Sequence, residues 1–188
     1  MKKQKRSYVL RARGDKMAET RARIVEAMVS LHQEVGPSRT TVSAIAERAG
    51  VERLTVYRHF RDETEMLAAC SHRYFELNPP PDPGGWADEL DPLKRAKRGL
   101  TEIYAFFSRT ALMFAQVYRD VGQNQAVTEL MSGFDAQQRQ VADMLAGAGK
   151  RRQLTLRHAI KFATWQSLES EGLDDAKKVA LVLDWLAD

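Results

Sequence analysis

Apolar residues recur every three or four positions through most of this 188-residue chain. One such stripe, at spacings of four, three and four, consists of Ile24, Met28, Leu31 and Val35. This spacing places the side chains on one face of an α-helix. No run of alternating β-branched residues interrupts the pattern, so we expect no β-strand. The sequence therefore predicts an all-α protein, and its length is enough for one or two domains with a buried core.

Glycine and proline mark where the first predicted helix, residues 20–35, comes to its end. Gly36-Pro37 follows it, because glycine accepts a left-handed turn and proline cannot continue a helix. A short helix capped by Thr41 comes next, then a turn at Gly50 and a second short helix over residues 53–60. Two short helices joined by a glycine turn and packed on an earlier helix form a helix-turn-helix. An ordinary helical hairpin is the alternative.

The remaining chain is also predicted to be helical, apart from one loop. A helix capped by Asp62 joins the two parts of the chain, and residues 78–86 form a loop because four prolines and two glycines remove backbone donors and order. Asp91-Pro92 starts the next helix, with a capping side chain followed by proline at the first helical position. The later predicted segments are a stripe from Leu93 to Phe107, a short piece at 111–117, and helices at 125–148, 153–171 and 174–187. Residues 150–152 are predicted to be a solvated basic corner between helices.

Charge is distributed unevenly along the chain, whose net charge is +4. Residues 1–62 hold 14 Lys and Arg against 7 Asp and Glu, whereas the remaining residues hold 15 against 18. A basic segment joined to a slightly acidic remainder favours contact with a polyanion, with a solvated basic tail as the alternative. The second short helix would expose a set of donors suited to base edges and phosphates: Arg53, Thr55, Tyr57, Arg58 and His59.

Several other classes of protein do not fit the sequence. Gly147-Ala-Gly-Lys150 lacks the spacing of a phosphate-binding loop, no G-x-S-x-G occurs, and the four histidines have no metal-ligand spacing. We therefore expect no enzyme, no cofactor and no metal site. The mean hydropathy is −0.45 and no apolar run reaches 18 residues, so we expect no membrane helix. With a single cysteine and no export signal, a reducing cytoplasm is the expected location.

The stretch from Thr41 to Phe60 resembles the DNA-binding domain of the TetR family of bacterial transcriptional regulators. The residues that carry the resemblance are Ile45-Ala46, Ala49-Gly50-Val51, Thr55, Tyr57 and His59-Phe60. The resemblance implies a homodimer that places two recognition helices in successive major grooves of a palindromic double-stranded operator. It divides the chain into a basic arm at 1–19, a helix-turn-helix domain at 20–67 and a ligand-binding and dimerisation domain at 68–188.

The resemblance also implies roles for individual residues. Thr41 and Ser43 would meet backbone phosphates, and residues 53–55 would lie where bases are read. Together with the exposed donors, the predicted DNA-binding set is Thr41, Ser43, Arg53, Leu54, Thr55, Tyr57, Arg58 and His59. Two positions depart from the family pattern, which often has glycine at Leu54 and a phosphate-binding lysine at Glu63. Basic residues of the arm could replace that anchor, or could form a merely solubilising tail: Lys2, Lys3, Lys5, Arg6, Arg11, Arg13 and Lys16.

Aromatic and methionine residues crowd the middle of the second domain. A cavity for a small hydrophobic or aromatic effector is predicted among Tyr104, Phe107, Met113, Phe114, Phe162 and Trp165, with a plain core as the alternative for each of them. The last helix is apolar nearly all round, which predicts a homodimer through the last two helices; a hairpin buried within one chain is the alternative. The predicted function is a ligand-responsive regulator, a repressor released by its effector. A constitutive DNA-binding or architectural protein is the alternative.

Overall fold

The structure is a computed structural model that describes the backbone of residues 2–187 and the side chains of residues 13–186. Within that range it is helical, with no strand. Its elements, in chain order, are α1 (Lys2–Val35), η1 (Pro37–Arg39), α2 (Val42–Ala49), α3 (Arg53–His59), α4 (Glu63–Leu77), η2 (Pro83–Trp86), α5 (Pro92–Asp120), α6 (Gln125–Ala146), α7 (Lys150–Ala159), α8 (Phe162–Ser170) and α9 (Asp175–Ala187). The predicted all-α fold with a helix-turn-helix and a second helical domain is confirmed.

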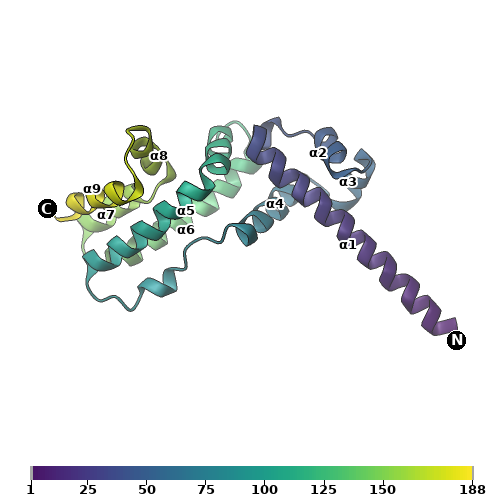
Figure 1. Ribbon diagram of the computed structural model, residues 1–188, viewed down its shortest axis with the longest axis horizontal. Coiled ribbons are helices and arrows are strands. Elements are labelled where there is room, and N and C mark those ends of the chain that lie inside the picture. The colour runs from purple at the N-terminus through teal and green to yellow at the C-terminus, as the bar shows by residue number, and fades with distance from the viewer. Residues whose placement is uncertain (1, 188) are drawn as a thin grey trace.

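The N-terminal domain consists of α1 to α4. Helices α2 and α3 pack beside α1 at one end of the molecule, and α4 leads away from them toward the second domain (Figure 1). Its core is made of fully or almost fully buried side chains from all of these helices: Ile24, Met28, Ile45, Val56, Phe60 and Cys70. Ile24, Met28 and Leu31 of the stripe predicted for the first helix face this core, whereas Val35 at its end is 37% exposed.

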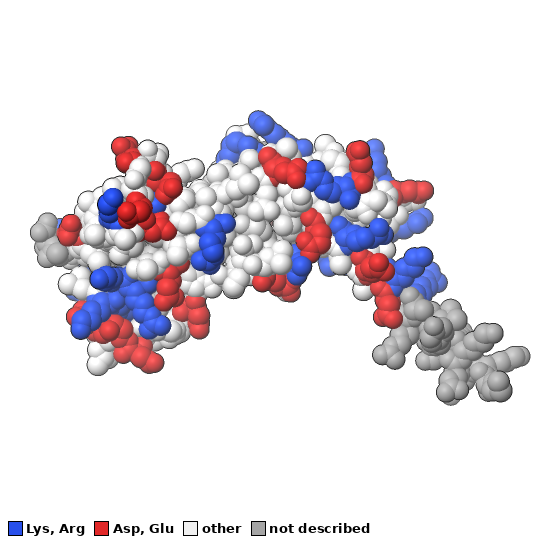
Figure 2. All heavy atoms as spheres, in the orientation of Figure 1, with Lys and Arg blue, Asp and Glu red and all other residues white. Residues whose placement is uncertain are grey.

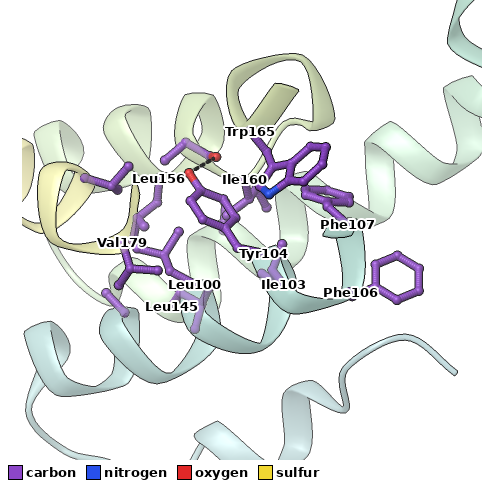
Figure 3. Packing of buried hydrophobic residues seen from close by; sticks show 14 of the residues in the cluster. Leu100, Ile103, Tyr104, Phe106, Phe107, Leu145, Leu156, Ile160, Trp165 and Val179 are labelled. Atoms are coloured by element: carbon purple, nitrogen blue, oxygen red, sulfur yellow. Dashed lines mark hydrogen bonds between the residues drawn. The ribbon is translucent and has the colours of Figure 1, made fainter. Parts of the chain in front are cut away.

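The C-terminal domain is built on the long hairpin of α5 and α6. These two helices run side by side through the domain, and α7, α8 and α9 gather at its far end, where the chain ends (Figure 1). Leu100, Leu145, Leu156 and Val179 fill the space between the hairpin and the last helices (Figure 3). The Tyr104 hydroxyl, also buried there, donates to the Ala159 carbonyl at 2.9 Å.

Side-chain caps start the helices where the sequence predicts them. The Thr41 hydroxyl accepts from Ala44 N, the Asp62 carboxylate accepts from Glu65 N, and the Asp91 carboxylate accepts from Leu93 N. Each oxygen satisfies a backbone N–H that has no partner within its own helix. Gly50 ends α2 with φ 64° and ψ 43°, the left-handed turn expected of a glycine between the two short helices.

Three predicted boundaries are wrong. Helix α1 begins at Lys2 rather than at residue 20, so no separate arm precedes it within the described backbone. Helix α5 continues to Asp120, without a break near residue 110. The Thr110 hydroxyl donates to the Phe106 carbonyl at 2.7 Å, and Thr110 is buried within a continuous helix. The helix predicted to begin at residue 153 begins at Lys150, so residues 150–152, predicted to be a solvated basic corner, form the first turn of α7.

The predicted helix at 153–171 is in fact two helices. The chain breaks at Lys161, whose backbone is extended with φ −70° and ψ 140°. No glycine or proline marks this break. One tertiary and one local hydrogen bond stabilise it. Gln138 Nε2 of α6 donates to the Ile160 carbonyl at 3.2 Å, and across the break the Thr164 hydroxyl donates to the His158 carbonyl at 2.7 Å. The break lets Phe162 and Trp165 turn into the core.

Candidate DNA interface and effector cavity

Helix α3 is anchored by one face and exposed by the other. Val56 is fully buried, and Phe60 directly after the helix is 1% exposed, so both hold α3 against α1 and α2. On the opposite face, Leu54 is 55% exposed and Tyr57 is 51% exposed. Arg53 is exposed as well. A short helix held in this way presents its outer side chains to a partner without needing to rearrange.

The structure brings the eight predicted DNA-binding residues to one end of the molecule. Thr41 and Ser43 are exposed at the start of α2, and Thr55 and His59 are half-buried on α3. Arg53 and Arg58 are exposed and form no ion pair with any described residue, so both cations are available to phosphates or bases. Lys and Arg side chains gather around this end, interspersed with a few carboxylates (Figure 2).

The structure describes the side chains of only some of the N-terminal basic residues for which DNA contact is one of the two predicted roles. Arg13 and Lys16 are exposed on α1. The side chains of Lys2, Lys3, Lys5, Arg6 and Arg11 lie outside the described residues. The role of this segment therefore stays a prediction.

Glu63, where the family pattern has a lysine, connects the two domains instead. It stands in the first turn of α4, and its Oε1 accepts a hydrogen bond from Asn124 Nδ2 at 2.7 Å. Asn124 at the same time caps α6, because its Oδ1 accepts from Val127 N at 3.0 Å. The departure from the family pattern thus replaces a cation on the DNA side with a contact to the second domain.

A cavity of about 320 Å³ lies where the two domains meet, and we call it the central cavity. Its walls come from α1, η1, α4, α5 and α6, so both domains enclose it. The apolar residues that line it include Leu67, Tyr74, Met113, Phe114, Val127, Met131 and Phe134. An apolar pocket of this size suits a small hydrophobic ligand.

Two polar side chains, His32 of α1 and Cys70 of α4, line the central cavity from the DNA-binding domain. Cys70 Sγ and His32 Nδ1 are 3.2 Å apart. Burial lowers the pKa of His32 to about 4, a shift that the nearby Asp120 carboxylate partly opposes. Burial also raises the pKa of the Cys70 thiol to about 12. Near neutral pH both groups are therefore uncharged, and the thiol can donate its proton to Nδ1.

Only some of the predicted effector residues line a cavity. Met113 and Phe114 line the central cavity. Phe107 lines a second cavity of about 220 Å³ beneath residues 80–86, which we call the loop cavity. Tyr104, Phe162 and Trp165 line neither of the two.

Those three residues belong to the packed core. Phe107 and Trp165 lie together there, with ring centroids 6.1 Å apart, and Tyr104 points toward the carbonyl that it binds (Figure 3). Phe162 stacks on Tyr118 and Trp165, with centroid distances of 5.6 and 5.5 Å. For these three residues the plain core, which the sequence analysis gave as the alternative to a cavity, is the correct interpretation.

The sequence reasoning missed the cavity walls supplied by α1, α4 and α6. On α6, Val127, Met131 and Phe134 follow each other at spacings of four and three, so helical periodicity could have placed them on one face. His32 and Cys70 carry no such signal, because their position on the cavity depends on how α1 packs against α4.

Further hydrogen bonds tie the end of α1 to the end of α5. Arg119 donates from Nη2 to the Val35 carbonyl at 2.8 Å, and Ser38 N donates to the Asp120 carboxylate at 2.8 Å. Gln116 Nε2 donates to the Glu34 carbonyl at 3.3 Å. These contacts satisfy carbonyls at the C-terminus of α1 and fix the DNA-binding domain to the wall of the central cavity.

Helices α8 and α9 have one buried side and one apolar side that this chain leaves partly open. Val179 and Val182 are buried, whereas Leu181 is 36% exposed and Trp185 is half-buried. Lys178 is fully buried, pairs with Glu169 and Asp175, and lies 4.8 Å from the centre of the Trp165 ring. The predicted dimer surface is therefore present as an apolar surface, while the interface itself stays a prediction.

The described residues lack two features. No helix among them is long and apolar enough to cross a membrane. They also contain no group of three or more His, Cys, Asp or Glu residues placed to hold a metal ion.

The fold and the exposed α3 define a helix-turn-helix protein with a separate helical domain. Residues 24–70 match the family model described as bacterial regulatory proteins, tetR family. The N-terminal domain therefore resembles the DNA-binding domain of that family.

Two curated relatives match over 97 residues. The chain is 33% identical to the probable HTH-type transcriptional regulator ArpR of Pseudomonas putida and 32% identical to the HTH-type transcriptional regulator TtgR of the same species. Each match covers 51% of this chain and 46% of the relative. The chain thus matches about half the length of these relatives.

Solved structures resemble the fold along most of its length. A TetR-like transcriptional regulator from Rhodococcus sp. RHA1 has a TM-score of 0.64 at 18% identity, covering 88% of this chain and 92% of that chain. NalD, the secondary repressor of the MexAB-OprM multidrug efflux pump in Pseudomonas aeruginosa, has a TM-score of 0.61 at 17% identity, covering 89% and 94%. The SmeT–triclosan complex has a TM-score of 0.62 at 21% identity, covering 89% and 90%.

Proposed function

We propose that this protein is a transcriptional regulator that binds a palindromic DNA operator as a homodimer and is released by a small, uncharged, hydrophobic effector. The observation that carries the proposal is the central cavity, because its walls belong both to the helices that support α3 and to the α5–α6 hairpin. A ligand seated there contacts both domains at once. It can therefore favour one arrangement of the two over the other.

DNA recognition rests on the exposed face of α3 and on the free cations Arg53 and Arg58. The operator would be found by selecting fragments of the host genome that the protein binds. Replacing Tyr57 and His59 together with alanine should then weaken binding to all sequences, because the family resemblance places both side chains at phosphates. Arg58→Ala should in addition make the salt dependence of binding shallower, because it removes an exposed cation of α3. Arg98→Ala on α5 serves as a control that removes an exposed cation far from α3 and should change neither quantity.

Effector release is tested with triclosan as the probe, since the fold resembles the SmeT–triclosan complex. At saturation, triclosan should lower operator affinity about 5- to 150-fold, the range of typical coupling free energies. Gly133 lines the central cavity, and a Cβ added there meets no atom within 4 Å. Gly133 is exposed, so Gly133→Leu should add apolar bulk at the edge of the cavity and weaken the response while leaving operator binding intact. Binding of triclosan without any change in operator affinity would favour a constitutive DNA-binding protein.

The homodimer rests on the half-open apolar side of α8 and α9. Ala163, Leu168 and Trp185 line a shallow groove on this surface, and Leu181 lies exposed on α9. A second copy of the chain, related by a two-fold axis, would cover the same surface on both protomers. It would also place the two α3 helices as a pair, which a palindromic operator requires.

A further inference from the structure

The loop cavity shares part of its wall with the central cavity. Phe75 of α4, and Phe134 and Gln137 of α6, line both. The Phe75 and Phe134 rings are stacked with centroids 6.4 Å apart and planes 9° apart, and both side chains are half-buried. A partition made of two aromatic side chains can open by rotation about side-chain bonds, without movement of a helix.

Taken alone, neither cavity has room for more than a small ligand. Small-molecule pockets span roughly 300 to 1,000 Å³. The central cavity, at about 320 Å³, lies near the lower limit of that range, and the loop cavity, at about 220 Å³, lies below it. Joined through the Phe75–Phe134 partition, the two reach a size well inside the range.

One wall residue of the loop cavity carries a buried hydrogen-bond donor without an acceptor. Trp86 lines this cavity and is 1% exposed, and its indole Nε1 has no hydrogen-bond partner among the described residues. The other buried tryptophan differs, because Trp165 Nε1 donates to Asp175 at 3.1 Å. A buried indole N–H normally finds a partner, and leaving it unpaired costs free energy. An acceptor brought by a ligand would remove that cost.

The lining also determines which charge a ligand can carry. No charged side chain lines the loop cavity, whose described walls are proline, aromatic and aliphatic residues with Gln137 and Gln138. Gln138 already donates its amide N–H to the Ile160 carbonyl. An ionised group would be desolvated there without a counter-charge, so the site selects against charged ligands.

We propose that the loop cavity is a second subsite of the effector site, and that it takes an uncharged aromatic group whose carbonyl or ether oxygen accepts a hydrogen bond from Trp86 Nε1. This inference rests on the proposed function, since it specifies the chemistry of the effector. A ligand with two linked aromatic parts would occupy both cavities, with the Phe75–Phe134 partition opened between them.

Two probes that differ in a single group test the donor. Benzophenone has a carbonyl between two phenyl rings, and diphenylmethane has a methylene in the same place. Calorimetric titrations would compare the two with the full chain and with Trp86→Phe, which keeps an aromatic ring but removes the N–H. In each protein, the affinity for benzophenone is divided by the affinity for diphenylmethane. The difference between this ratio in the wild type and in Trp86→Phe measures the contribution of the hydrogen bond.

The expected change is a roughly two- to tenfold loss of benzophenone affinity relative to diphenylmethane in Trp86→Phe, the range for a net hydrogen bond. Trp165→Phe, the same substitution at a tryptophan that lines neither cavity and whose N–H is already bound to Asp175, should leave the ratio unchanged. Val141 lines the loop cavity but not the central one, so Val141→Trp should abolish benzophenone binding.

Each result bears on the subsite separately from the proposed function. An affinity ratio that is the same in the wild type and in Trp86→Phe would overturn the subsite, as would failure of both probes to bind the wild type. In either case triclosan could still release operator DNA through the central cavity, and the proposed function would stand. If triclosan failed to release operator DNA while the probe titrations gave the expected ratios, the proposed function would be contradicted and the subsite at Trp86 would stand.

Discussion

His32 is a buried histidine that folding keeps uncharged. Its ring lies against Cys70 at the wall of the central cavity, and burial holds its pKa near 4, well below the value of about 6.5 of an exposed histidine. Between these two pH values the unfolded chain binds a proton that the folded chain does not. The contribution of His32 to stability is therefore fully present above about pH 6.5 and is lost as the pH falls toward 4.

The stability of the wild type should accordingly fall more steeply with acid than that of His32→Gln. The expected difference between the two proteins, accumulated from pH 7 to pH 4, is on the order of 3 kcal/mol. Urea unfolding followed by circular dichroism at a series of pH values measures it, with each protein referred to its own value at pH 7. His72→Gln, at an exposed position, is the matched control. Parallel pH profiles for the wild type and His32→Gln would contradict the prediction.

Glu63 offers a second test at the scale of one residue. Glu63→Lys places a cation at the start of α4, where the family pattern has one, and removes the acceptor of the Asn124 hydrogen bond. We expect tighter binding to all DNA sequences, with the slope of the salt dependence steeper by about one. Fluorescence anisotropy at several salt concentrations measures both. Glu63→Gln, which adds no charge, should not show the steeper slope; if it does, the cation is not the cause.

At the scale of secondary elements, the α5–α6 hairpin contains two helical glycines with opposite surroundings. A Cβ on Gly99 of α5 would lie 2.5 Å from Leu145 Cδ2 on α6, so this glycine permits the close approach of the two helices. A Cβ on Gly133 of α6 meets no atom within 4 Å. Nothing in the packing requires a glycine there, and a glycine within a helix is less favourable than alanine.

Alanine should therefore have opposite effects at these two positions. Gly133→Ala should stabilise the fold by about 0.5–1 kcal/mol, because alanine loses less backbone entropy in a helix. Gly99→Ala should destabilise it by about 1–3 kcal/mol, since Leu145 has to move out of its packed position. Chemical denaturation measures both, and each variant serves as the control for the other. Equal effects of the same sign would show that helix propensity, and not the spacing of the two helices, dominates.

At the scale of the whole molecule, the two ends of the chain have different surfaces. Lys and Arg side chains lie at the α1–α3 end among several carboxylates, a second group of them lies at the opposite end, and the middle of the same face is largely free of charge (Figure 2). The α8–α9 end has an apolar side that one chain covers only in part. This division fits a protein that contacts DNA at one end and a second copy of itself at the other.

We expect Leu181→Glu to shift the protein from dimer to monomer at micromolar concentration, because a carboxylate buried between two copies would lack a partner. Sedimentation velocity measures the change. Leu90→Glu, at a loop position that is 89% exposed, adds the same charge and should leave the dimer intact. A wild type that sediments as a monomer, or a Leu181→Glu variant that remains dimeric, would place the interface elsewhere.

The helix-turn-helix end of this protein could be predicted from its sequence. The cap at Thr41, the turn at Gly50 and the anchors Val56 and Phe60 lie within twenty consecutive residues. Their geometry follows from local rules of capping, left-handed glycine and helical period. The exposed face of α3 could therefore be predicted residue by residue, and so could the starts of α4 and α5.

The place where a ligand can bind could not be predicted from the sequence, because it depends on how distant segments pack. The walls of the central cavity come from residues as distant in the chain as His32, Cys70, Phe114 and Phe134. Aromatic residues in a packed core and around a cavity obey the same helical period, so the pattern could not separate Phe114 from Phe162. The break at Lys161 likewise lacks a glycine or proline and depends on contacts from α6. Which apolar faces meet, and where they leave space, depends on packing between segments far apart in the sequence, and local periodicity carries no information about that packing.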